Sequence, residues 1–464
     1  MDILIILFAL LFLIFVAYKG FSVILFAPIA AMLAVLLTGP GLVLPFYSGV
    51  FLEKMAGFIK LYFPVFLLGA IFGKLIAMSG FAKAITRFVV RIFGEGKAII
   101  AIVVVCAVLT YGGVSLFVVA FAVYPFATEL FRAADIPKRL IPATIALGAF
   151  TFTMDAFPGT PQIQNIIPTT FFHTDAWAAP WLGLCGGSFI LFGGVSYLQW
   201  EKRKAARRDE GYGVNHLNEP VEIINLQVAN PAVAVLPLVL VGVFNKVFTA
   251  LIPRLYGKSF DFANLGINDA APLDVSKLTG VWAVEGALLV GIAAVVLLAF
   301  RQLRSNFNAE INVSIGGALL ATLNIASEYG FGAVIAALPG FKAVSRGIAS
   351  TFHNPLINEA VTISALSGIT GSSSGGLSIA LASMSETYLE QAAKLGIPNE
   401  VLHRVATMAS GGMDTLPHNG AVITLLAITG LTHKQSYKNI FVMTGFKTAG
   451  AFLIIGLYYL FGMV

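Results

Sequence analysis

The sequence predicts an all-α polytopic membrane protein built as an inverted repeat, with about five spans, one re-entrant hairpin and one broken helix in each half. Two observations support this fold class. Hydrophobic residues make up 58% of the 464 residues and charged residues only 11%, whereas soluble domains carry about 25% charged residues. In addition, short motifs from the first half of the chain return in the same order in the second half.

The repeat is visible in motifs that recur at a nearly constant offset. The dipeptide GF at 80–81 recurs at 340–341, which is 260 positions later (340 − 80). The string MDAFP at 154–158 recurs as MDTLP at 413–417, which is 259 positions later (413 − 154). Matching polar interruptions inside apolar segments of two halves are typical of secondary transporters.

Apolar segments of about 20 residues, long enough to cross a bilayer, set the predicted topology. They lie near 2–18, 21–38, 55–79, 139–170 and 177–199 in the first half, and near 229–252, 281–300, 312–338, 401–430 and 440–462 in the second. Basic residues open the polar linker 201–228, so we expect it in the cytoplasm of a cell whose inner membrane holds the chain. Because each half has an odd number of crossings, repeats 1–200 and 229–464 must have opposite orientation.

The remaining composition limits the partners that the chain can have. A net charge of +6 does not indicate a nucleic-acid partner, because cytoplasmic loops of membrane proteins collect Lys and Arg. Cys106 and Cys185 each lie in an apolar run, which favours small core residues over a disulfide or a metal pair. We therefore expect a lipid bilayer, a small solute and a coupling ion as partners, with no metal and no cofactor.

Segments 98–131 and 356–395 are apolar but interrupted in the middle, and we expect each to form a re-entrant hairpin. Non-helical backbone persists at membrane depth only where protein or a watery cavity surrounds it. Glycine lets backbone approach a ligand, and the helix after the tip presents free N–H groups. Tight packing of small residues between helices is the alternative. The candidate substrate-binding residues at the two tips are Thr110, Gly112, Gly113, Ser115, Ser372, Ser373, Ser374 and Gly375.

Segments 139–170 and 401–430 are predicted to be broken helices. Pro158, Pro161 and Pro417 each remove a backbone donor within these apolar segments. Such a break exposes helix ends and carbonyl groups that can bind an anion and a cation, whereas the alternative is a simple proline kink. The candidate substrate-binding residues at the breaks are Thr160, Gln162, Asn165, Thr415, His418 and Asn419.

Ionisable residues within these segments are the candidate proton-coupling sites. Asp155 and Asp414 are equivalent by the repeat, and a carboxylate inside a span is costly enough that a functional role is the default. Capping of the broken helix is the alternative role. Histidine is the side chain that ordinarily titrates near neutral pH, so His418 is a further candidate. Glu285, Glu328 and Glu359 also lie in or beside apolar segments, but they are weaker candidates because they lie outside the matched pattern. We expect no arginine or lysine at these sites, so backbone amides, helix ends and hydroxyls would hold an anion.

Residues 81–93 are predicted to form an amphipathic helix in the membrane interface. Lys83, Arg87 and Arg91 recur every four residues beside an apolar face. Such a helix either joins a mobile domain to a fixed one or simply connects two spans.

Three strings give the chain a resemblance to a known family over nearly its whole length. They are GSSSGGLSIAL at 371–381, HRVATMASGGMDTLPHNGAVITLLAITGLTH at 403–433 and TMDAFPGTPQIQN at 153–165. The chain resembles the gluconate permease family of proton symporters, within the ion-transporter superfamily. The resemblance implies import of sugar acids or of hydroxy acids such as 3-hydroxybutyrate, a homodimer, and a transport domain that moves as an elevator. Asp155 departs from the family pattern, which has a histidine in that neighbourhood, and this favours a sister branch with another small carboxylate.

The expected function is therefore proton-coupled symport of a small hydroxy- or keto-carboxylate, without enzymatic activity. Sodium coupling is the nearest alternative, because unwound carbonyls with Ser372, Thr415 and Asn419 could surround a sodium ion. An anion channel would also explain re-entrant hairpins. An intramembrane aspartyl protease is disfavoured because Met413 separates Gly412 from Asp414, so the glycine-aspartate context of such enzymes is missing.

Overall fold

The computed structural model describes residues 2–18, 21–114, 116–214, 216–219, 230–265, 272–304, 307–341, 352, 354–417 and 419–464. The first half forms α1 (Asp2–Tyr18), α2 (Val23–Thr38), η1 (Pro40–Leu42), α3 (Val43–Phe46), the π-helix η2 (Tyr47–Leu52), α4 (Glu53–Met78), α5 (Phe81–Phe93), η3 (Glu95–Lys97), α6 (Ala98–Tyr111), α7 (Leu116–Ala133), η4 (Lys138–Leu140), α8 (Ile141–Ala149), α9 (Phe152–Asp155), α10 (Ile163–Phe172) and α11 (Pro180–Ala206). The second half forms α12 (Pro231–Tyr256), β1 (Ser259–Phe260), η5 (Phe262–Leu265), β2 (Leu273–Asp274), α13 (Val275–Leu303), α14 (Phe307–Ala337), α16 (Pro355–Thr370), α17 (Ser373–Leu395), α18 (Asn399–Gly412), α19 (Gly420–Thr429) and α20 (His433–Phe461).

The long helices have the length and surface of membrane spans. Within the described ranges, six helical segments are long and apolar enough to cross a bilayer, namely Pro40–Met78 and helices α11, α12, α13, α14 and α20. Large apolar side chains point outward from them, such as Leu297 at 81% exposure and Phe192 at 67%. Helices satisfy every backbone hydrogen bond internally, which lipid requires. The prediction of an all-α polytopic membrane protein is confirmed.

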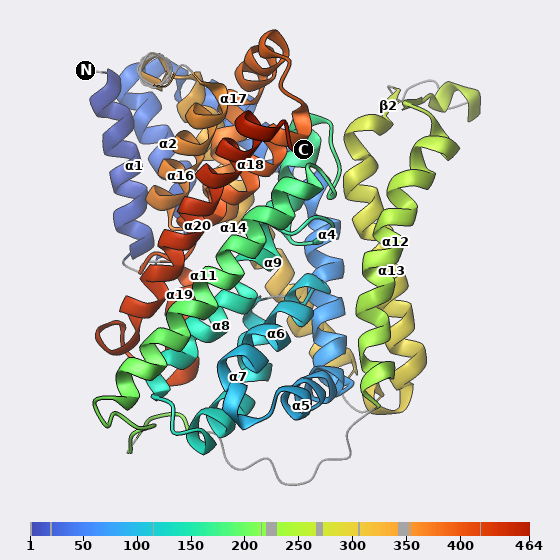
Figure 1. Ribbon diagram of the computed structural model, residues 1–464. Helices are drawn as coiled ribbons and strands as arrows, with labels where there is room; N and C mark the ends of the chain where they lie inside the picture. Colours follow the sequence, from blue (N-terminus) through green and yellow to red (C-terminus); the bar gives the residue numbers. More distant parts are fainter. Residues whose placement is uncertain are drawn as a thin grey trace.

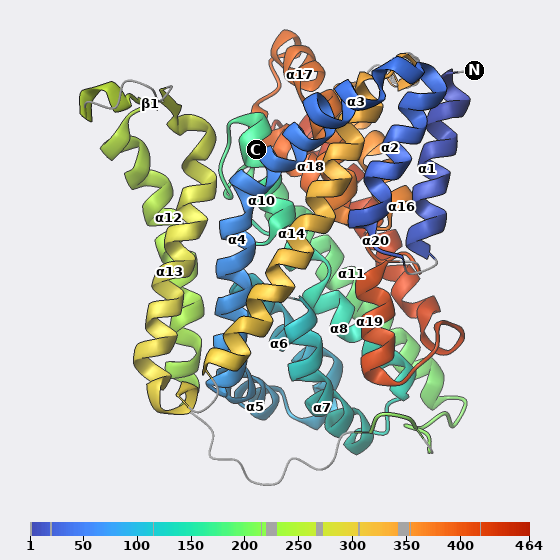
Figure 2. The same cartoon turned by 180° about the vertical axis from the view of Figure 1, so that it is seen from behind.

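Two helical hairpins occupy opposite ends of the molecule. Helices α6 and α7 pack together around a tip that contains Gly113, and α16 packs on α17 around a tip at Gly371. Both glycines have a left-handed backbone, with φ of 95° and 65°, which glycine adopts without the steric cost of a Cβ atom. The first hairpin lies in the lower half of Figure 1 and the second in the upper half, and Figure 2 shows the same arrangement from behind.

Each half also contains a helix that is interrupted and then continues. In the first half, α8 ends at Ala149, a single turn forms α9, and α10 begins only at Ile163, with Pro158 and Pro161 in the gap. In the second half, α18 ends at Gly412 and α19 begins at Gly420. Pro158 and Pro161 in the first gap and Pro417 in the second cannot donate to a preceding helical turn, which disfavours continuous helix across either gap.

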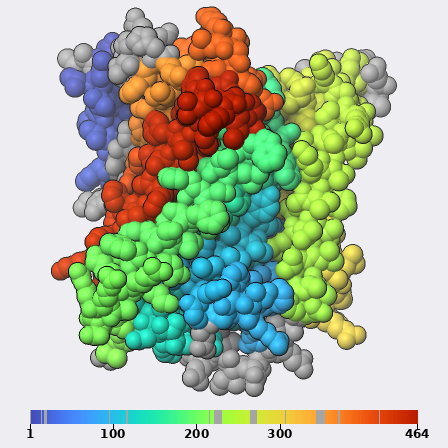
Figure 3. All heavy atoms as spheres, viewed as in Figure 1, coloured from blue at the N-terminus to red at the C-terminus, as the bar shows by residue number. Residues whose placement is uncertain are grey.

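Helices α12 and α13 form a separate column along one side of the molecule (Figures 1 and 3). They pack mainly on each other, and their main contacts with the rest of the chain are to α4, α5 and α10. A two-residue antiparallel strand pair joins their ends, with Ser259 opposite Asp274.

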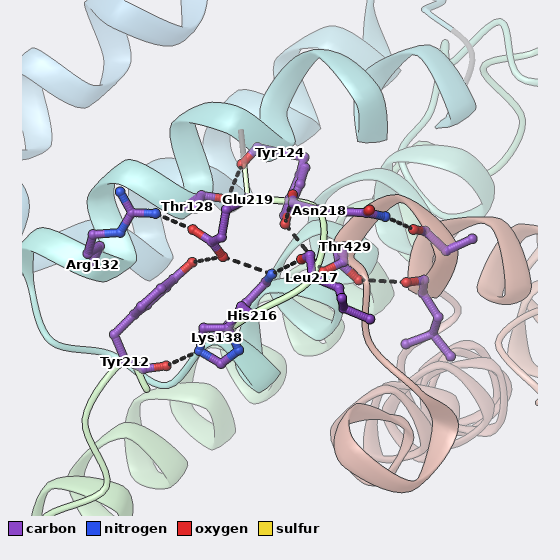
Figure 4. Close-up of polar contacts among 12 residues, drawn as sticks. Tyr124, Thr128, Arg132, Lys138, Tyr212, His216, Leu217, Asn218, Glu219 and Thr429 are labelled. Atoms are coloured by element: carbon purple, nitrogen blue, oxygen red, sulfur yellow. Dashed lines mark hydrogen bonds and ion pairs between the residues drawn. The ribbon is translucent and has the colours of Figure 1, made fainter. Parts of the chain in front are cut away.

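The linker begins later than the sequence suggested, because α11 continues to Ala206 and residues 201–206 are helical. The described residues 212–214 and 216–219, called here the linker segment, are tied to three elements (Figure 4). Lys138 Nζ of η4 lies 2.8 Å from Glu219 Oε1, and the Arg132 side chain of α7 pairs with the other carboxylate oxygen. Asn218 Nδ2 donates to the Ala427 carbonyl of α19 at 2.8 Å. The linker segment thus joins the first hairpin to the second broken helix.

Glu219 is held ionised by these contacts. Its partial burial by itself would raise the pKa, but hydrogen bonds from Lys138, Tyr212 and Arg132 outweigh that effect. The pKa of Glu219 therefore lies below its ordinary value.

Candidate functional site

The second hairpin tip is bonded directly to the second break. Asp414 Oδ1 accepts a hydrogen bond from the Ser373 backbone N–H at 3.2 Å and another from Asn419 Nδ2 at 2.8 Å. Asn419 Nδ2 also donates to the Gly371 carbonyl at 2.8 Å. The Asn419 Oδ1 atom accepts from the backbone N–H of Ala421 and so caps α19. Tip and break therefore form one polar unit, and Asp414 lies at its centre.

Hydroxyl groups extend this unit into α18. Ser373 Oγ donates to Ser410 Oγ at 3.1 Å, and Ser410 Oγ in turn donates to the Thr407 carbonyl at 2.8 Å. Ser372 Oγ caps α17 by accepting from the Gly375 N–H at 3.0 Å, and Ser374 is buried beside it. The tip thus presents a row of hydroxyls around the start of α17.

The buried carboxylate of Glu328, on α14, lies against the same tip. A Cβ atom at Gly375 would overlap Glu328 Oε2, so only glycine permits this approach. Within the part of the chain that the structure describes, Glu328 Oε2 has no hydrogen-bond partner.

The first tip is bonded to the first break in a corresponding way. Gln162 Nε2 donates to the Thr110 carbonyl at 2.8 Å, and Tyr111 Oη donates to the Pro158 carbonyl at 2.7 Å. Gly113 lies against the Pro161 ring, and Gly112 lies against Leu238 of α12. The Thr110 and Thr160 hydroxyls are buried and have no partner among the described residues.

The two breaks meet at Asp155. Its carboxylate is buried, with Oδ2 3.3 Å from Lys447 Nζ of α20. Lys447 Nζ also donates to the Phe150 carbonyl at 2.6 Å. Asp155 lies so close to Gly411 of α18 that a Cβ atom there would overlap the carboxylate. An aspartate of the first half is therefore enclosed by two helices of the second half.

Asn165 holds a second buried cation in place. Its Oδ1 accepts from Arg404 Nη1 at 3.1 Å and faces His403 Nε2 at 3.2 Å. Its Nδ2 donates to the Thr160 and Ala176 carbonyls. Arg404 also donates through Nε and Nη2 to the Ala178 carbonyl, at 3.1 and 2.6 Å. The Asn165 side chain thus links the first break to α18, which is a positioning role.

The remaining predicted residues lie at the edge of this arrangement. Thr415 Oγ1 is 2.6 Å from Thr444 Oγ1 of α20, and the Tyr437 hydroxyl donates to the Thr415 carbonyl at 3.3 Å. Ser115 and His418 lie outside the described residues. Gly411, which Asp155 contacts, accepts a hydrogen bond from the Asp414 N–H at 3.1 Å, so the first break is linked through α18 to Asp414 and the second tip.

Sequence comparison identifies the kind of protein that carries this site. No family model matches the chain. It is 57% identical over 472 residues to the uncharacterized transporter YxjC of Bacillus subtilis (strain 168), and the match covers 100% of both chains. The chain belongs to this family of transporters.

Solved structures show that this transporter shares its fold with a known protein. MtrF of Neisseria gonorrhoeae, which is reported to illuminate a class of antimetabolite efflux pumps, matches with a TM-score of 0.54 and 13% identity, over 91% of this chain and 85% of MtrF. The YdaH transporter of Alcanivorax borkumensis matches with a TM-score of 0.49 and 14% identity, over 92% and 90% of the two chains.

Two cations of this transporter were missed by the sequence reasoning. The expectation that the site lacks arginine and lysine was wrong, because Lys447 pairs with Asp155 and Arg404 is fully buried beside Asn165. The sequence did contain a signal for both cations. Arg404 lies in the same predicted broken helix, 401–430, as Asp414, and Lys447 is the single charged residue of the predicted span 440–462. An ionisable residue in a span calls for a partner.

Proposed function

We propose that this transporter is a proton-coupled symporter of a small hydroxy- or keto-carboxylate, such as a gluconate-like sugar acid or 3-hydroxybutyrate. The observation that supports this proposal is the buried ion pair between Asp155 and Lys447 where the two broken helices meet. A buried pair is tolerable because its charges compensate each other, and loss of one charge leaves the other uncompensated. Binding of one proton to Asp155 would therefore leave the Lys447 ammonium available to a substrate carboxylate.

Charge balance then couples the two solutes. In the empty site Asp155 and Lys447 form a neutral pair. A proton alone leaves an uncompensated ammonium group, and an anion alone adds a second negative charge; both states are costly in a buried site. When proton and carboxylate are both bound, protonated Asp155 is neutral and Lys447 pairs with the substrate. The states suited to crossing are the empty site and the site that holds both.

Hydroxyl groups around the breaks fit the rest of such a substrate. The Thr110 and Thr160 hydroxyls are buried and have no partner among the described residues, and Ser373 and Ser410 bond to each other. Buried hydroxyls without partners favour a ligand that supplies hydrogen-bonding groups of its own. A carboxylate that carries hydroxyl or keto groups meets this requirement, and a hydrocarbon acid does not.

Of the two aspartates, Asp155 is the better candidate for the proton carrier. Its carboxylate faces a cation that protonation would release. Asp414 instead accepts hydrogen bonds from the second tip and from Asn419, so its proposed role is to close that tip over the site. His418 stays a prediction.

The wider setting follows from the resemblance to gluconate permeases. We propose a homodimer in a cell inner membrane, with the linker 201–228 in the cytoplasm. The hairpins and broken helices would move as the transport domain of an elevator, while α12 and α13 would belong to the scaffold. The separate column that α12 and α13 form supports this division.

The proposal is tested by uptake into proteoliposomes that contain the purified chain. Gluconate, 3-hydroxybutyrate and related hydroxy- and keto-acids are offered under an inwardly directed proton gradient, with and without sodium. We expect accumulation of at least one of these acids in sodium-free buffer, and its loss when a protonophore is added. Accumulation that requires sodium and ignores the proton gradient would contradict proton coupling and favour the sodium alternative.

A further inference from the structure

A pocket lies away from the transport site, between the amphipathic helix α5 and the first hairpin arm α7. Its volume is about 400 Å³, and its lining includes Arg87, Val90, Arg91, Phe126, Glu129 and Leu130. Figure 1 shows α5 and α7 side by side at the end of the molecule where α11 leads into the linker. Among the described residues, neither hairpin tip contributes to this lining, so the pocket is separate from the site around Asp155.

The charges in the pocket suit a phosphate group. Arg87 and Arg91 are one helical turn apart, so their guanidinium groups can approach one ligand from the same face of α5. A guanidinium group binds phosphate oxygens through two parallel N–H donors. Val90, Phe126 and Leu130 supply apolar lining beside these donors.

The surroundings of the pocket place it at a membrane surface. Phe88 and Ile92 of α5 are 45% and 62% exposed, and Phe121 of α7 is 61% exposed. Exposed large apolar side chains next to arginines are typical of an amphipathic helix that lies at the level of lipid headgroups. A phosphate that enters this pocket therefore comes with an acyl chain that can cover the exposed apolar side chains.

Glu129 restricts the charge of the lipid headgroup that can bind. Its carboxylate lines the same pocket as the two arginines, so a ligand with negative charge alone would be repelled on that side. A headgroup that carries an ammonium group beyond its phosphate satisfies all three residues.

We propose that this pocket binds a phospholipid of the phosphatidylethanolamine type, with the phosphate on Arg87 and Arg91 and the ammonium group on Glu129. Because α5 connects α4 to the first hairpin, the bound lipid would lie where the chain enters that hairpin.

The test is native mass spectrometry of the delipidated full chain with one defined phospholipid at a time. We expect one phosphatidylethanolamine to bind more tightly than phosphatidylcholine, whose quaternary ammonium group cannot donate to Glu129. Arg91→Ala should weaken this binding about tenfold or more, as expected for loss of a charge-assisted contact. Glu129→Gln should remove the preference over phosphatidylcholine.

The matched control is Lys83→Ala, which removes an exposed cation of the same helix outside the pocket. It should leave lipid binding unchanged. Equal lipid binding by wild type and by the Arg87→Ala/Arg91→Ala variant would overturn the proposal. Displacement of the lipid by millimolar inorganic phosphate would also overturn it, because the site would then take free phosphate. If the alanine variant does not fold, Arg91→Lys replaces it in this comparison. Lysine keeps the charge but lacks the two parallel N–H donors, so lipid binding should again be weaker than in the wild type.

Discussion

Breaking the Asp155–Lys447 pair from one side should be far more damaging than removing both charges. At 3.3 Å and an effective dielectric constant of about 20, the attraction between the two charges is about 5 kcal/mol. Both side chains are about 1% exposed, so a lone survivor would remain desolvated. We therefore expect Lys447→Met or Asp155→Asn alone to lower the free energy of unfolding by about 3–5 kcal/mol.

The double variant, Asp155→Asn with Lys447→Met, should recover most of that loss, because a neutral pair needs no compensation. The assay is a double-mutant cycle on the detergent-solubilised chain, followed by denaturant unfolding. Lys74→Met serves as the control, since Lys74 pairs with Glu310 in a partly exposed position and the pair should contribute little to stability. Additive losses in the cycle would refute the idea that these two charges compensate each other.

Three further changes follow from single contacts. Gly411→Ala places a Cβ atom into the Asp155 carboxylate and should cost about 1–3 kcal/mol of unfolding free energy. Gly445→Ala in α20, with nothing within 4 Å, should be neutral or slightly stabilising, since alanine favours helix over glycine. Equal unfolding midpoints for the two variants would contradict this packing. In Arg404→Lys, the single ammonium group cannot donate to both Ala178 and Asn165 as the guanidinium group does. The substitution should lower the free energy of unfolding by about 1–3 kcal/mol in the same denaturant assay. An unchanged midpoint would show that the guanidinium group is dispensable. Because the folded-state pKa of Glu219 is lowered, the ion pairs of Glu219 should stabilise the linker segment fully above the unfolded pKa of about 4.3. This stabilisation should weaken as the pH falls through the lower folded pKa. Hydrogen exchange of the linker segment should become faster over that pH range in the wild type but not in Glu219→Gln.

The outline of the fold was accessible to sequence reasoning because lipid restricts the choices. Apolar length and basic clusters identify spans, and interrupted apolar runs identify hairpins and breaks, since unpaired backbone is costly in a bilayer. The predicted hairpin 356–395 differs from α16 and α17 by one residue. The predicted linker start at 201 was less accurate, because charged residues can continue a helix once it has left the apolar region, as α11 does to Ala206.

The partners of the candidate residues were not accessible in the same way. Asn165 was expected to bind substrate, yet its amide group is engaged with Arg404 and two carbonyls. Lys447 lies 292 positions from Asp155 (447 − 155), and the repeat offset does not pair them. Contacts between the halves depend on how the repeats pack, which periodicity within one segment does not encode.

The decisive measurement for coupling through Asp155 is proton-driven uptake by the Asp155→Asn variant. In proteoliposomes, this variant should still bind the substrate on the free Lys447 but should no longer accumulate it in response to a proton gradient. The Asp414→Asn variant, which keeps its side-chain carbonyl as an acceptor for the second tip, should still respond to that gradient. Gradient-driven accumulation by Asp155→Asn at the wild-type level would show that Asp155 does not carry the coupled proton.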